Sequence, residues 1–211
     1  YDDVVKRFGN AKEPALLELV AKALYNKGFR LGSLNRSDEA IAIYDDVVKR
    51  FGNAKEPALL ELVAKALYNK GFTLGSLNRS DEEIAVYDDV VKRFGNAKEP
   101  ALLERVAKAL VNKGVRLMLL EKKEDSQKTF SRIIETFGAH QELNIQVCMV
   151  VALAGIERFN EAIPLLQHLV QKDKQNAREC IPDLELLASA PQASEEARKF
   201  IEEARKMLET V

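Results

Sequence analysis

Apolar residues recur between Pro14 and Leu34 at spacings of three, four and seven, the pattern of one face of an α-helix. This first stripe consists of Leu17, Val20, Leu24, Leu31 and Leu34. A second stripe with helical spacing follows, made of Ile41, Tyr44, Val47, Val48 and Phe51. Only residues 35–37 separate the two segments. The pattern therefore predicts two helices that lie side by side and antiparallel.

This helix pair is one unit of an internal repeat. Residues 1–43 recur as residues 44–86 with three changes, namely Arg30 to Thr73, Ala40 to Glu83 and Ile43 to Val86. A third copy begins at Tyr87 and diverges after Val111. The period is 43 residues, as the Phe-Gly pairs that begin at Phe8, Phe51, Phe94 and Phe137 show. A period of this length predicts an all-α solenoid of stacked helix pairs.

Residue types that favour helix ends support these boundaries. Pro14 suits the first helical turn, where its missing N–H costs nothing. Ser37 is expected to act as the N-cap of the second helix, and Ser80 with Glu83 to form a capping box in the next copy. Gly52 is expected to end the second helix in a left-handed conformation.

Residues 21–52, AKALYNKGFRLGSLNRSDEAIAIYDDVVKRFG, resemble the tetratricopeptide repeat (TPR) family. Gly28 and Ala40 stand where the family has the small pair that lets its helices approach closely. Two features depart from the family pattern: Gly52 and Asn53 replace the usual terminal proline, and the unit exceeds the usual 34 residues. The resemblance is to the long-repeat bacterial variety with near-identical copies. It implies a right-handed superhelical solenoid of antiparallel helix pairs.

Three regions follow from the repeat. Residues 1–138 hold the near-identical repeats and begin with a half repeat. Residues 139–173 form a divergent repeat in which Arg158 follows Lys122 by 36 residues instead of 43, so seven residues are missing from the connection or the first helix. Residues 174–211 are expected to form capping helices, ending in a charged helix from about residue 194 to 211 that closes the core.

Composition and charge narrow the classes of function. The 32 basic residues nearly cancel the 33 acidic ones, and a nucleic-acid-binding protein would normally carry a basic excess. No apolar run approaches the roughly 18 residues of a membrane span, so we expect neither nucleic acid nor a membrane as partner. Cys148 and Cys180 are too few for a disulfide framework and indicate a reducing compartment, which predicts the cytoplasm.

The resemblance also implies a binding surface. TPR proteins hold an extended peptide or a helix on the concave surface lined by their first helices. The positions carried over are Lys22, Tyr25, Asn26 and Phe29, then Lys65, Tyr68, Asn69 and Phe72, then Lys108 and Asn112, with Val111 and Val115 replacing the aromatic residues. Asparagine can donate to and accept from a peptide backbone, aromatic rings offer rigid contact area, and lysine can meet carboxylates.

Two alternatives bear on this surface. In the first, repeat duplication copied these residues along with all the others, and Tyr25 and Phe29 only pack against the neighbouring repeat. The carboxylate clamp of chaperone-binding TPR proteins is half present, because Tyr25 and Phe29 stand where that clamp carries lysine and asparagine. A chaperone C-terminus is therefore not the favoured ligand.

Catalytic chemistry finds little support. The adjacent pair Asp45–Asp46 cannot act together, because neighbouring residues of a helix do not face one another. His140 and His168 lack cysteine or carboxylate partners at metal-ligand spacing. Glycine-rich phosphate loops, HExxH and GxSxG are missing from the sequence. We expect no cofactor, no metal and no enzymatic activity.

The leading hypothesis is a protein- or peptide-binding scaffold that is part of a longer protein. A second hypothesis is a structural array that associates with itself through Val4, Val5 and Phe8 of the N-terminal half repeat. A third, an engineered consensus array, suits the near-identical copies but not the divergence after Val111.

Overall fold

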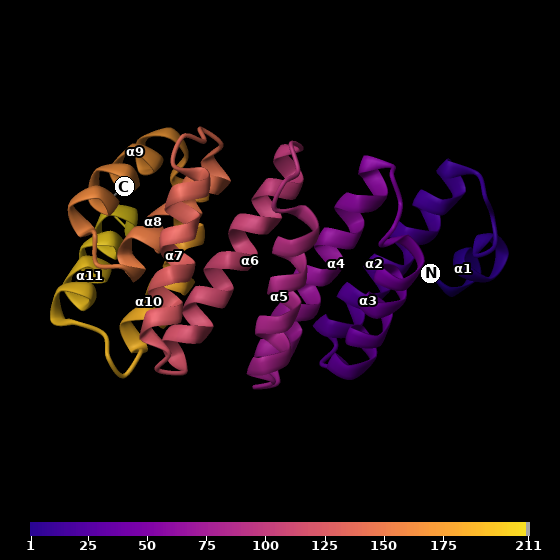
Figure 1. Cartoon of the computed structure of the whole chain (residues 1–211), viewed down its shortest axis with the longest axis horizontal. Helices are drawn as coiled ribbons and strands as arrows, with labels where there is room; N and C mark the ends of the chain where they lie inside the picture. The colour runs from indigo at the N-terminus through magenta and orange to yellow at the C-terminus, as the bar shows by residue number, and fades with distance from the viewer. Residues whose placement is uncertain (210–211) are drawn as a thin grey trace. The chain divides into compact units, whose positions relative to one another are not determined.

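The chain is built from α-helices, and its computed structural model describes residues 1–209. Within that range it contains no β-strand and a single 3-10 turn, η1 (Arg178–Cys180). The helices, shown in Figure 1, are α1 (Asp2–Phe8), α2 (Pro14–Ser33), α3 (Ser37–Phe51), α4 (Pro57–Ser76), α5 (Ser80–Phe94), α6 (Pro100–Leu119), α7 (Lys123–Phe137), α8 (Leu143–Gly155), α9 (Phe159–Ala177), α10 (Ile181–Ser189) and α11 (Glu195–Glu209). The predicted all-α architecture is confirmed.

Two compact units divide the chain, and the boundary between Val106 and Ala107 falls inside α6. In the first unit α2 packs on α3, α3 on α4 and α4 on α5, while α2 also contacts α4 directly. The first helices of successive repeats are therefore neighbours in this unit. In the second unit α8 packs between α7 and α9, and α11 packs on α9 and α10.

The helix boundaries follow the sequence signals for the first helices. Pro14 and Pro57 are the first residues of α2 and α4, as their missing N–H groups favour. Helices α2, α4 and α6 have 20 residues each, but α8 has only 13, so the seven residues missing from the divergent repeat were lost from its first helix. In α9 the backbone kinks at Asp173, whose φ of −155° is not helical, where the repeat was expected to end.

An aromatic ring on a glycine joins the two helices in the pairs α2–α3, α4–α5 and α6–α7. A Cβ atom added at Gly28 would lie 2.7 Å from the ring of Tyr44 on the following helix. The same distance is 2.5 Å for Gly71 and Tyr87, and 2.5 Å for Gly114 and Phe130. All three rings are almost fully buried. The backbone of the first helix thus approaches its partner as closely as the ring permits, which only glycine allows.

The expected caps were wrong in three places. Arg36 and Arg79 occupy the N-cap positions, Ser37 and Ser80 are the first helical residues, and no side chain caps either end. Ser80 and Glu83 therefore form no capping box, and Glu83 is buried. Gly52 has a right-handed backbone, with φ of −62° and ψ of −18°.

The left-handed residue lies instead at the end of the first helix. Asn35 has a φ of 58°, and Asn78 has the same value. The Arg36 N–H donates to the Leu31 carbonyl and the Asn35 N–H to the Gly32 carbonyl, both at 3.0 Å, which is the Schellman pattern of helix termination. Asparagine tolerates this conformation better than most residues, so the chain reverses within three residues.

The charged last helix buries a narrow apolar stripe made of Ala197, Phe200, Ile201, Ala204 and Leu208. Phe200 lies against Phe159 of α9, with ring centroids 5.3 Å apart. The helix is described to Glu209, so the last two residues of the expected segment lie outside the described residues.

Replacing Gly71 by alanine should destabilise the protein by about 1–3 kcal/mol, because the new methyl group would overlap the buried Tyr87 ring. Gly32→Ala is the matched control, since a Cβ there meets only Ala40 at 4.0 Å. That control should be neutral or more stable by up to about 1 kcal/mol, because alanine favours helix over glycine. Urea unfolding followed by circular dichroism measures both, and equal stability of the two variants would contradict the ring-on-glycine contact.

Candidate functional site

The surface of α2 and α4, which we call the first-helix face, carries the residues predicted to bind a peptide. On α2 the positions are Lys22, Tyr25, Asn26 and Phe29, and on α4 they are Lys65, Tyr68, Asn69 and Phe72. Phe29 and Phe72 are 60% and 62% exposed. Tyr25, Tyr68 and Asn69 are half-buried, whereas Lys22 and Asn26 are exposed. The two aromatic positions therefore differ: the phenylalanines face solvent, whereas the tyrosines are partly packed.

Asn69 joins the two repeats at this face. Its side-chain amide donates to the Tyr25 hydroxyl across the α2–α4 contact, at 3.1 Å. The Tyr25 and Tyr44 rings are tilted neighbours with centroids 6.4 Å apart. Burial raises the pKa of Tyr44 to about 12, and a hydrogen bond with Asn69 opposes that rise. Asn69 is thus held in a network of phenols, which fixes its side chain beside the exposed Phe72.

A cavity of about 310 Å³ opens between α2 and α4 at this point. It is lined by Phe29, Gly32 and Ser33 of α2, Asn35 of the loop, Ser37 and Tyr44 of α3, and Asn69, Phe72, Thr73 and Ser76 of α4. Phe29, Asn69 and Phe72 were predicted as binding residues, and the cavity brings them together. The other residues were missed, although the change from Arg30 to Thr73 is one of only three differences between the first two copies.

The lysines of the face each have an acidic neighbour. Lys22 pairs with Glu18 and Lys65 with Glu61, both at 2.5 Å and both one turn earlier on the same helix. Glutamate four residues before lysine is the favourable order on a helix. These pairs neutralise much of the positive charge that was expected to meet carboxylates.

The third set of predicted residues begins the second compact unit. Lys108 lies 3.3 Å from Glu179 and also acts on Asp183 of α10. Val111 and Val115, which replace the aromatic residues, are 2% and 3% exposed. Asn112 is half-buried. The exposed phenylalanines therefore have no equivalent on this part of α6.

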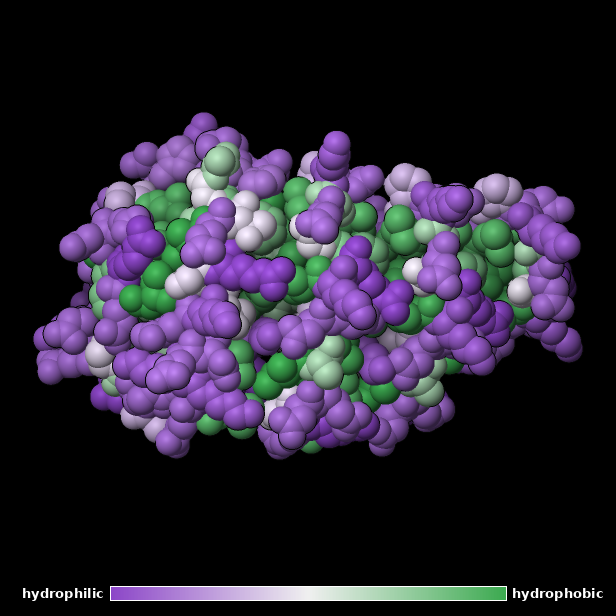
Figure 2. Space-filling view, in the orientation of Figure 1, coloured by the Kyte–Doolittle hydropathy of each residue, from purple (hydrophilic) through white to green (hydrophobic). Residues whose placement is uncertain are grey.

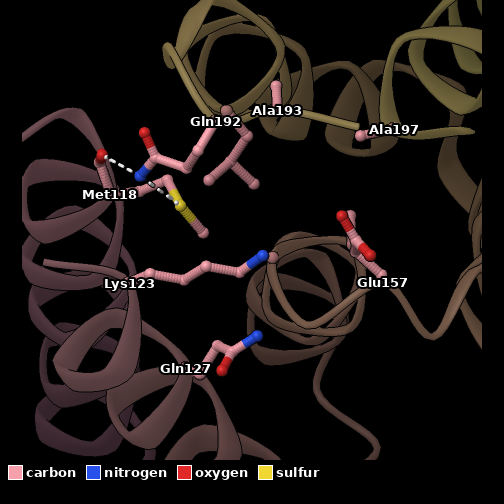
Figure 3. A pocket seen from close by; sticks show the side chains of 10 residues that line it. Met118, Lys123, Gln127, Glu157, Gln192, Ala193 and Ala197 are labelled. Atoms are coloured by element: carbon pink, nitrogen blue, oxygen red, sulfur yellow. Dashed lines mark hydrogen bonds between the residues drawn. The ribbon is translucent and has the colours of Figure 1, made fainter. Parts of the chain in front are cut away.

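A much smaller cavity, of about 20 Å³, lies in the second unit between α6, α8 and the segment before α11. Figure 3 shows Gln192 reaching across it, and the Gln192 side-chain nitrogen donates to the Met118 carbonyl at 2.6 Å. Lys123 and Glu157 approach from opposite sides in the same view. The volume suits one water molecule, so this cavity has a packing role.

Other candidate chemistry is sparse in the described residues. No group of three or more His, Cys, Asp or Glu within residues 1–209 could hold a metal ion. Cys148 and Cys180 are buried free thiols, and burial raises the pKa of Cys180 to about 12. His140 packs edge-on to Phe137 and contacts Glu142. Over the same range, every helix is too short or too polar to cross a membrane.

The surface is mostly hydrophilic, with apolar strips showing between polar side chains in Figure 2. Exposed large apolar residues include Phe29, Phe72, Leu34, Leu77, Leu120 and Leu186. Val4, Val5 and Phe8 are half-buried, and their helix α1 contacts α2. Association through this end of the chain stays a prediction.

Comparison with known proteins identifies the repeat. Residues 64–96, from within α4 to just after α5, match the family model of the tetratricopeptide repeat. Among curated proteins, none matches the sequence closely enough to be a relative.

Solved structures show the same fold at low identity. One holds the nearly identical TPR-like repeats of a candidate kinesin light chain from Podosopora anserina, with 13% identity and a TM-score of 0.50 over 88% of this chain and 93% of that chain. A variant of the same protein has 14% identity and a TM-score of 0.51 over the same fractions of the two chains. A tetratricopeptide repeat protein from Parabacteroides merdae has 13% identity and a TM-score of 0.47 over 98% of this chain and 87% of that chain. The shared feature is the solenoid of helix pairs.

The half-buried Asp183 beside Lys108 predicts a dependence of stability on pH. Burial raises the pKa of Asp183 from 3.8 to about 6, and the charge of Lys108 opposes this rise. Below about pH 4 the carboxyl group is neutral in both states. Between about pH 4 and 6 the unfolded chain loses this proton first, so the folded state loses stability, and above about pH 6 the loss is constant.

Asp183→Asn removes this titration. The variant should therefore gain free energy of unfolding relative to wild type between pH 4 and pH 7, on the order of 1 kcal/mol, below the roughly 3 kcal/mol that a fully buried group would give. Urea unfolding at both pH values measures the difference. A constant difference between variant and wild type would show that Asp183 titrates normally.

Proposed function

We propose that this chain, a tetratricopeptide-repeat protein, is a scaffold that binds an extended peptide segment of a partner protein through the first-helix face. The observation that supports this most directly is the exposure of Phe29 and Phe72, 60% and 62%, on adjacent helices beside one cavity. Fully burying such a side chain contributes about 1.5–3 kcal/mol, so two exposed rings at equivalent positions are a source of binding energy.

The spacing of the helices suits an extended ligand. Packed helices lie about 8–10 Å apart, and an extended chain advances about 3.3 Å per residue. Phe29 and Phe72 would therefore meet side chains about three residues apart on the peptide. The exposed amide of Asn26, one turn before Phe29 on α2, could hydrogen-bond the peptide backbone, for about 0.5–1.5 kcal/mol net.

Charge contributes less to this proposal than the sequence suggested. Because Lys22 and Lys65 are paired with Glu18 and Glu61, the face offers alternating charge rather than a row of cations. An exposed ion pair of this kind contributes about 0–1 kcal/mol of stability. A ligand carboxylate that replaced the glutamate beside one of these lysines would therefore add little binding free energy. We propose a mainly uncharged ligand segment whose affinity changes little with salt.

Binding rather than catalysis fits a site made of aromatic, amide and hydroxyl groups that are fixed by their neighbours. The two buried free thiols support a reducing compartment, and we propose the cytoplasm on that ground.

The test begins with selection of peptides from a random display library on the immobilised chain. Calorimetry then compares the affinity of one selected peptide for wild type and for Phe29→Ala/Phe72→Ala. Losing both rings should weaken binding by about 10-fold or more. The matched control is Leu186→Ala, an apolar residue 43% exposed on α10, which should bind as wild type does. Equal affinity of all three proteins would remove the first-helix face from consideration.

A further inference from the structure

We infer that the cavity between α2 and α4 is a specificity pocket for one aromatic side chain with a hydrogen-bonding tip, tryptophan or tyrosine, on the partner peptide. This inference rests on the proposed function, because it names the residue that the first-helix face selects. It goes beyond that function in assigning a ligand side chain to a particular repeat junction.

The chemistry of the lining points to an uncharged aromatic group. Phe29 and Phe72 line the cavity and are exposed, so a third ring could pack against them in the tilted or offset geometry that aromatic pairs prefer. The lining contains no charged side chain, although 31% of the chain's residues are charged. A charged ligand group would lose its hydration here without gaining a counter-charge.

Polar groups in the lining separate an aromatic ligand with a polar tip from a purely apolar one. Hydroxyls of Ser33, Ser37 and Ser76 and the amide of Asn69 share the cavity with the two rings. The hydroxyls of Ser33 and Ser76 already donate to backbone carbonyls and the Asn69 amide donates to a neighbouring phenol, so what these groups offer a ligand is mainly acceptor oxygens. An aliphatic side chain would cover these oxygens without giving them a donor, which is unfavourable. An indole N–H or a phenol O–H could donate to them while the ring covers the apolar wall.

The size of the cavity limits the ligand to a single side chain. A volume of about 310 Å³ lies at the lower end of the range for ligand-binding pockets, which is about 300–1,000 Å³. Two of its lining residues, Phe29 and Phe72, are exposed, so the rest of the peptide would stay on the surface.

Thr73 is the residue that leaves this space open. Arginine stands at the equivalent positions of the neighbouring copies, Arg30 and Arg116. The short threonine side chain is 9% exposed, lines the cavity, and donates its hydroxyl to the Asn69 carbonyl one turn earlier, at 2.8 Å. An arginine at this position would extend its side chain into the cavity and bring a positive charge. One substitution in a copied repeat thus distinguishes this junction.

The opposite wall is formed by Gly32 on α2. A Cβ there would meet only Ala40, at 4.0 Å, so the backbone itself does not require glycine. The missing side chain instead contributes to the open volume. Thr73 and Gly32 can therefore be changed independently to fill the same cavity from two sides.

The chain contains no tryptophan, which makes a direct assay available. The probes are the peptides acetyl-Ala-Ala-Trp-Ala-Ala-amide and its Tyr, Leu and Glu counterparts. Tryptophan fluorescence excited at long wavelength reports the first, and competition against it reports the others. We expect the Trp and Tyr peptides to bind wild type at least 10-fold more tightly than the Leu and Glu peptides.

The variants test the pocket from both walls. Thr73→Arg and Gly32→Leu should each weaken the Trp peptide at least 10-fold, while Thr73→Ser, which keeps the hydroxyl and the space, should bind within about 2-fold of wild type. Thermal melts by circular dichroism identify any variant that fails to fold. If one of the two cavity-filling variants does not fold, the variant on the other wall provides the test.

The outcomes separate this inference from the proposed function. Equal binding of Trp and Leu peptides, with no effect of filling the cavity but a loss in Phe29→Ala/Phe72→Ala, would overturn the pocket and leave the peptide-binding face. Failure of every peptide to bind, together with no effect of the phenylalanine variant on a selected peptide, would overturn both. Binding of free N-acetyltryptophanamide as tightly as the Trp peptide would overturn the assignment to a peptide and favour a small aromatic ligand.

Discussion

Three helix pairs of this chain, α2–α3, α4–α5 and α6–α7, are held together at close range by an aromatic ring that lies on a glycine of the partner helix. Tyr44, Tyr87 and Phe130 lie on Gly28, Gly71 and Gly114, where a single added methyl group would overlap the ring. The contact also sets the rotation of the first helix about its axis. Because Phe29 and Phe72 follow these glycines directly, about 100° further around the helix, the packing that buries the glycines turns both phenylalanines outward. The exposed face is thus a consequence of the core contact.

Near-identical sequence does not make the copies equivalent. The first two copies differ at three positions, and two of these have structural effects: Thr73 lines the cavity, and Glu83 is a buried acid where the first copy has the buried Ala40. In the third copy Val111 and Val115 replace an aromatic pair and are buried. Repetition supplies a uniform scaffold, whereas single substitutions give one junction its own chemistry. A binding surface in such an array is therefore best sought where a copy departs from its neighbours.

Hydrogen bonds across the face affect what it can offer to a ligand. Asn69 was predicted to bind a peptide backbone, yet its amide donates to Tyr25 of the preceding repeat. The bond joins the repeats and orients the amide at the edge of the cavity. The lysines were likewise expected to attract carboxylates, but each has a glutamate one turn away. What remains for recognition is mainly aromatic and hydroxyl surface.

Apolar spacing and proline act locally, so the all-α repeat, its period and the start of the first helices at Pro14 and Pro57 could all be predicted from the amino-acid sequence. The loss of seven residues and the end of the repeat near Asp173 were also visible in the sequence, but the structure assigned the loss to α8 and showed the kink at Asp173. The helix caps were predicted wrongly, because Ser37 and Gly52 can adopt several conformations. In the folded chain the reversal is made instead by the Schellman turn at Asn35. Which copied residues meet depended on the tertiary structure: Phe29 lies on α2 whereas Asn69 and Thr73 lie on α4, and only the α2–α4 contact brings them around one cavity.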